Sequence, residues 1–211
     1  MGERMTGNLA PAAGAAGPAG PAAMSLAEAA DGADWGRGRP PVRDPRVLEF
    51  LDGWLRFRGA RAMPRRSDIM PMSFPRLLPN LYLYERYDGA GNFRCVLAGE
   101  EIHTVWRRPI MGLDVREMFA PADLRRILTR WNRVLDGPAA LHGHYRSTDE
   151  ARTAERLLLP VSDEDGAPRF VFGITLYRLG GDTVGNDTAP NTDLQFYRLS
   201  GLSGLDEAAA P

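Results

Sequence analysis

The sequence predicts an α+β fold, in which a five-stranded antiparallel sheet carries helices on one face and an N-terminal helix caps it. The first observation behind this prediction is the element order. Two short strand-like segments precede a run of helical patterns, and three further strand-like segments follow that run. The second observation is that neighbouring strand segments are joined by polar links of hairpin length, which is typical of antiparallel pairing. A chain of 211 residues accommodates one such domain with a sizeable core.

Composition divides the chain into three regions. Residues 1–41 are rich in Ala, Gly and Pro, so we expect a flexible segment, within which Met24 is an alternative start. Residues 42–178 hold the predicted domain, and residues 179–211 are predicted to be a mostly irregular tail. Within that tail, four residues have the character needed to dock on the domain: Leu194, Phe196, Tyr197 and Leu199.

The domain opens with a predicted helix over residues 44–58. Asp44 is a good N-cap, Pro45 suits the first helical position, and Gly59 ends the pattern. The apolar stripe of this helix must be buried, either on the outer surface of the sheet or against its copy in a second chain. The residues expected to make that contact are Leu48, Leu51, Trp54 and Leu55.

The remaining elements follow from turn signals and helical spacing. In chain order they are strands at 81–87 and 93–97, short helices at 100–106 and 114–119, a longer helix at 121–136, and strands at about 140–147, 154–161 and 169–178. The longer helix is amphipathic, with an apolar face that we expect to be buried. Its charged residues are predicted to line the solvent side: Asp123, Arg125, Arg126, Arg130 and Arg133.

Composition excludes several classes of protein. The net charge is −1, so the arginines of the longer helix are interpreted as a solvated face and not as a nucleic-acid surface. No apolar run is long enough to span a bilayer, and the single cysteine excludes an internal disulfide. These features indicate a cytoplasmic protein. All 26 basic residues are arginine, which we interpret as the codon bias of a GC-rich bacterial genome.

The element order and several local motifs resemble the PAS domain superfamily. The resemblance covers residues 43–178 and is closest to short, stand-alone bacterial PAS-type proteins with no attached output domain. It implies a sensory or protein-interaction role, frequently as a dimer, and no single ligand. The motifs that carry it are Arg65–Ile69, Leu77–Leu81, Phe93–Gly99, Arg108–Gly112, Glu155–Val161 and Phe170–Tyr177.

The sequence lacks the residues that bind flavin or haem in PAS relatives. Light-sensing relatives carry a reactive cysteine in an Asn-Cys-Arg-Phe-Leu type motif, whereas Cys95 lies in a predicted strand. Haem-binding relatives usually hold the iron with a histidine on the helix that corresponds to 121–136, and this helix has none. His142 and His144 are two residues apart and project from one strand face, but no third ligand is identifiable, so we assign no metal site.

An enzyme would need catalytic groups that the sequence does not provide. His103 lies near Glu100, Glu101 and Asp114 and could form an acid–base pair, but no nucleophile or metal motif accompanies it. We therefore predict a protein that is not an enzyme. Two rival interpretations remain: a small-molecule-processing enzyme on a related cone-shaped α+β fold, and a structural adaptor without a cavity.

The resemblance also locates an interior space between the sheet and the central helices. The side chains expected to line it are Cys95, Leu97, Ile102, His103, Trp106, Phe119, Ile127, Leu128, Trp131, Tyr145, Leu157 and Ile174. The number of large apolar residues favours a packed core over an empty cavity, and the sequence leaves this open. We expect a small ligand or a regulator protein to shift the balance between two arrangements of helix 44–58 or of a homodimer, and so to pass a signal in trans.

Overall fold

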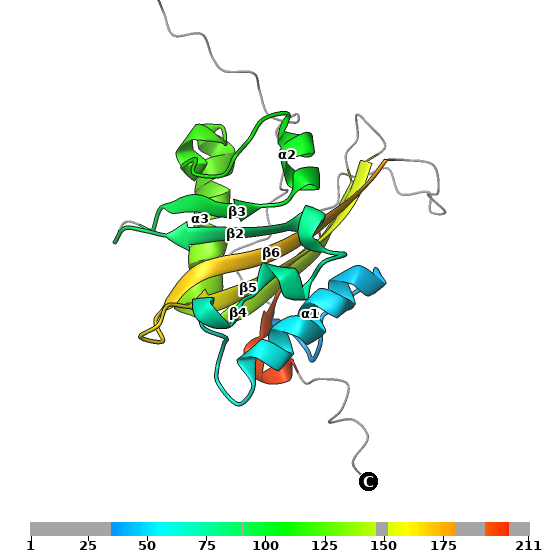
Figure 1. Cartoon of the computed structure of the whole chain (residues 1–211), viewed down its shortest axis with the longest axis vertical. Coiled ribbons are helices and arrows are strands. Elements are labelled where there is room, and N and C mark those ends of the chain that lie inside the picture. The colour runs from blue at the N-terminus through cyan, green and yellow to red at the C-terminus, as the bar shows by residue number, and fades with distance from the viewer. Residues whose placement is uncertain (1–34, 90, 147–151, 180–192, 203–211) are drawn as a thin grey trace, which may run out of the picture.

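The computed structural model describes residues 35–89, 91–146, 152–179 and 193–202, which form one sheet with helices on both of its faces (Figure 1). The helices are α1 (Pro45–Arg58), α2 (Glu100–Trp106) and α3 (Pro121–Asp136). The strands are β1 (Trp35–Gly36), β2 (Leu81–Arg86), β3 (Phe93–Ala98), β4 (Ala139–Arg146), β5 (Arg152–Ser162), β6 (Pro168–Leu179) and β7 (Asp193–Arg198). Within these residues, no helix combines the length and the apolar character that crossing a bilayer requires.

The sheet has seven strands in the order β1-β7-β4-β5-β6-β2-β3. All neighbouring pairs are antiparallel except β1 and β7, which run parallel. The predicted α+β class is therefore confirmed, and β2–β6 are the five predicted strands, although the sheet has two strands more than predicted.

The additional strands come from segments that the sequence predicted to be flexible or irregular. In β7, Phe196 and Tyr197 are buried, and the strand pairs with the outer edge of β4. An unpaired edge strand exposes a row of backbone donors and acceptors, and β7 satisfies those of β4. The tail was predicted to be mostly irregular, but residues 193–198 form this strand; residues 180–192 and 203–211 lie outside the described part of the chain.

Helix α1 covers one face of the sheet and has the predicted ends (Figure 1). The Asp44 carboxylate accepts a hydrogen bond from the backbone N–H of Arg46, and Gly59 ends the helix with φ of 55°, a conformation that favours glycine. Leu51, Trp54 and Leu55 are buried in the core beneath α1, and Leu48 is half-buried. The stripe therefore packs on the chain's own sheet.

Helix α3 lies on the opposite face of the sheet (Figure 1). Ile127 and Val134 are buried as predicted, but so are Asp123 and Arg130, which the sequence placed on the solvent side. That prediction is wrong because it followed residue type. At helical spacing, positions 123, 127, 130 and 134 form one stripe, so the two charged residues point inward with the apolar ones.

Candidate functional site

The interior between the sheet and helices α2 and α3 gathers more than half of the predicted lining residues. Seven of them belong to one cluster on this face: Cys95, Ile102, Trp106, Phe119, Ile127, Leu128 and Trp131. Aromatic rings interlock here. The Trp131 ring lies 4.4 Å from Tyr84 and 5.3 Å from Phe93, and Trp106 lies 5.0 Å from Phe119, all between ring centroids. This part of the interior is thus filled by packed rings.

Three predicted lining residues lie on the other face of the sheet. Leu157 and Ile174 are directly paired across β5 and β6 and belong to the core beneath α1. Leu97 packs against the same core. The pairing of β2 with β3 shifts register here and passes over Val96, which reverses the alternation of faces between Cys95 and Leu97. These residues therefore do not share a wall with Cys95, and their placement corrects the prediction.

The last two predicted lining residues take different positions. His103 is half-buried on α2, and its Nδ1 accepts a hydrogen bond from the backbone N–H of Ile110 at 3.2 Å. This bond ties the turn after α2 back to the helix, which gives His103 a structural role. Tyr145 pairs through its backbone with Ala154, but its side chain lies outside the described part of the chain.

A polar group that the sequence analysis missed lies on the α3 face of the sheet. Thr175 Oγ1 accepts a hydrogen bond from Arg156 Nε at 3.0 Å and lies 3.2 Å from the Tyr82 hydroxyl. Burial, together with the nearby charges of Arg156 and Arg126, lowers the pKa of the Arg130 guanidinium. The guanidinium groups of Arg130 and Arg156 therefore lie near each other between α3 and the central strands. The signal available in the sequence was the helical spacing that places Arg130 on the buried stripe.

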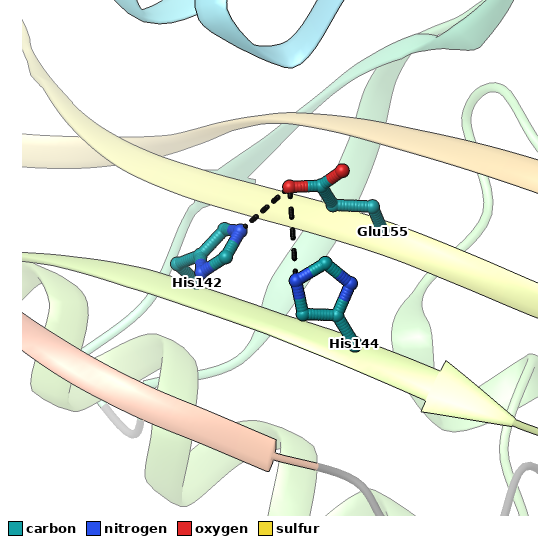
Figure 2. Close-up of side chains that lie close together, drawn as sticks. All are labelled: His142, His144 and Glu155. Atoms are coloured by element: carbon teal, nitrogen blue, oxygen red, sulfur yellow. Dashed lines mark hydrogen bonds and ion pairs between the residues drawn. The ribbon is translucent and has the colours of Figure 1, made fainter. Parts of the chain in front are cut away.

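A second polar cluster lies on the opposite face, where His142 and His144 of β4 approach Glu155 of β5 (Figure 2). His142 Nε2 is 2.9 Å from Glu155 Oε1, and His144 Nε2 is 3.9 Å from the same oxygen. The register of the hairpin sets this arrangement, because His144 is directly paired with Glu155 and His142 lies two residues further along the same face. The shared face of the two histidines is thus as predicted.

The start of α1 closes over this cluster. The backbone N–H of Arg43 donates to Glu155 Oε1 and that of Asp44 donates to Oε2, both at 2.8 Å. Burial by itself would raise the pKa of the Glu155 carboxyl. The hydrogen bonds from His142, Arg43 and Asp44, with the charge of His144, outweigh it and lower that pKa, so the group is a carboxylate. His142 and Glu155 are buried, while the His144 side chain keeps 24% of its surface exposed.

Glu155 is the third ligating group that the sequence analysis did not identify. In the observed register, even-numbered residues of β4 pair with odd-numbered residues of β5. Glu155 therefore falls on the face of His142 and His144 in every register that pairs even- with odd-numbered residues, whereas a one-residue slip would place it on the other face. The signal was present, but it required pairing the two strands before considering any ligand set.

The comparisons with known proteins support the family and add no close relative. A family model described as a PAS domain matches residues 42–176, nearly two thirds of the chain. This match covers the predicted domain almost from end to end and confirms the resemblance drawn from the sequence motifs. No curated protein matches the chain.

Proposed function

The chain belongs to the PAS domain family, and on that premise we propose that it is a sensory or interaction module whose α3-side interior binds a small anionic molecule. Domains of this family generally act without catalysis. In this proposal the anion changes how the domain engages a second protein, either another copy of the chain or a regulator in trans, in the cytoplasm.

The observation that carries the proposal is the concentration of guanidinium groups beside hydroxyls. Arg130 is buried, and Arg156 lies close enough for its charge to lower the pKa of the Arg130 guanidinium. A carboxylate or phosphate is recognised by the planar, forked donors of arginine, and the hydroxyls of Tyr82 and Thr175 add neutral partners. The site therefore suits a small carboxylic acid or a phosphate.

Isothermal titration calorimetry with a panel of mono- and dicarboxylates and inorganic phosphate tests the proposal. We expect at least one anion to bind, and Arg156→Gln to weaken it at least tenfold. Arg125→Gln is the matched control, because Arg125 is an exposed arginine on α3 and its loss should leave affinity unchanged. Absence of binding by every anion, or equal losses in both variants, would leave the structural-adaptor interpretation in its place.

Association between chains is the second part of the proposal. The apolar stripe of α1 is used inside the chain, so the contact must lie elsewhere. Met70 and Met72 support such a surface, because these neighbouring side chains keep 61% and 75% of their area exposed. Methionine is adaptable at binding surfaces. Native mass spectrometry of the freshly purified protein measures both the oligomeric state and any bound metabolite, and a monomer at high concentration would contradict the dimer.

The enzyme interpretation gains no support from the placement of His103. Its Nδ1 is occupied by the Ile110 N–H, and the nearby Asp114 carboxylate is bound by Arg116 and Tyr87. An acid–base pair needs a titratable ring within reach of a carboxylate that faces substrate. The polar groups on the α3 side instead fit binding.

A further inference from the structure

We propose that His142, His144 and Glu155 form a binding site for a divalent transition-metal ion of the zinc type, on the sheet face beneath the start of α1. This site goes beyond the proposed function, because it lies on the opposite face of the sheet from the anion site. It also involves none of the cofactors that the family resemblance brought into consideration.

The ligand atoms already lie near the spacing that a metal imposes. One atom from each of the three side chains can be chosen so that all lie within 4.8 Å of one another. Bonds of 2.0–2.1 Å in a tetrahedral zinc site place ligand atoms about 3.3 Å apart. The two distances from Glu155 Oε1 to the histidine Nε2 atoms, 2.9 and 3.9 Å, lie on either side of that value. Ångström-scale side-chain shifts would therefore complete the site.

The two imidazoles and the carboxylate already point toward one another on the observed backbone. Both histidines present Nε2 to the same carboxylate oxygen, as Figure 2 shows. Their rings stand at 90° with centroids 5.1 Å apart. When a cation binds, any proton on the ligating nitrogens is released to solvent, and both histidines coordinate as neutral imidazoles.

The groups around the carboxylate act as an outer shell. The Arg43 and Asp44 N–H groups hold both oxygens of Glu155 at 2.8 Å, which fixes the plane of the carboxylate before any ion arrives. Burial of His142 and Glu155 keeps the site largely dry, and the partial exposure of His144 gives an ion its access from solvent. Three protein ligands leave at least one coordination position for water or another ligand.

The chemistry of the ligand set decides the class of ion. Two imidazoles with one carboxylate suit zinc, copper, nickel, cobalt or ferrous iron, whereas magnesium and calcium prefer sites made of oxygen atoms. Because Glu155 also accepts from the two residues at the entry to α1, an ion would fix the start of that helix. We therefore expect metal binding to raise the melting temperature of the domain.

The test is zinc titration of the full, untagged chain after chelator treatment, with bound metal measured by mass spectrometry of the dialysed protein. We expect one zinc per chain, and His144→Ala should weaken binding at least tenfold. His103→Ala is the matched control, since the chain has three histidines and His103 lies on α2, so its loss should leave one zinc bound. Cobalt substitution should give visible absorption bands that His144→Ala abolishes.

The variants also separate loss of ligation from loss of folding. His144 is partly exposed, so its alanine variant should keep the circular dichroism spectrum of the parent chain, whereas Glu155→Gln removes a buried group that supports α1. Zinc should raise the melting temperature of the parent and of His103→Ala, and not of His144→Ala. Substoichiometric zinc in the parent, or full binding by folded His144→Ala, would overturn the proposal.

Discussion

Replacing Trp54 with alanine tests how α1 is held. Its side chain is fully buried between α1 and the sheet, and its indole Nε1 donates to the Pro160 carbonyl of β5 at 3.0 Å. Deleting a buried tryptophan side chain costs about 3–5 kcal/mol of the free energy of unfolding. In a chain of this size, each kcal/mol lowers the melting temperature by about 2–4 °C, so we expect a fall of about 6–20 °C. Trp54→Phe keeps an aromatic ring at this position but leaves the Pro160 carbonyl without its donor, which should lower the free energy of unfolding by about 1–3 kcal/mol.

Urea unfolding followed by far-ultraviolet circular dichroism measures these losses, at two protein concentrations a hundredfold apart. Leu48→Ala is the control on the same helix, and because Leu48 is half-buried its cost should be about 1 kcal/mol. The expected losses are independent of protein concentration, since Trp54 contacts its own chain. If the parent's midpoint rose with concentration and Trp54→Ala removed that dependence, the α1 stripe would be an interface between chains and the reasoning would be refuted.

Two further predictions concern packing. Gly53→Ala should lower the free energy of unfolding by up to about 2 kcal/mol, because the added Cβ would lie 2.2 Å from the Phe74 ring. Overpacking of this kind costs about 1–3 kcal/mol, more than the gain of about 1 kcal/mol from helix propensity. A more stable variant in the same urea assay would contradict it. Burial raises the pKa of Cys95 to about 11, from 9.0, which leaves about a hundredfold less thiolate at pH 8 than in the unfolded chain. Iodoacetamide should therefore modify native Cys95 at least about a hundredfold more slowly than the urea-unfolded protein, and native rates within tenfold would count against a buried thiol. The raised pKa favours the folded state at pH values below 9, and this contribution is lost as the pH rises through 11.

Local signals predicted the elements well. The α1 boundaries follow from Asp44, Pro45 and Gly59, whose backbone and capping preferences act within a few residues. Likewise Gly137 ends α3, and the bounds of β4, β5 and β6 lie close to the predicted ones. These preferences depend on neighbours in the chain, so one sequence is enough to identify them.

The sheet face toward which a side chain points is harder to predict in strands that are buried on both sides. Leu157, Leu158 and Leu159 are all buried, so the polar–apolar alternation that would assign Leu157 to one face is missing. The irregularity at Val96 reverses the face of Leu97 and arises in the pairing with β2, so the residue pattern of β3 alone does not reveal it. The lining of the α3-side interior was therefore only partly predictable.

The sequence by itself determined the α+β class, the helix ends, the order along the chain of the five predicted strands and the shared face of His142 and His144. Only the tertiary structure decided that β7 extends the sheet, that Arg130 lies inside, and that Glu155 joins the two histidines beneath α1. The physical reason is the range of the interactions. Caps, turns and strand periodicity act between neighbours in the chain, whereas strand register and the burial of a charge depend on residues brought together from distant segments.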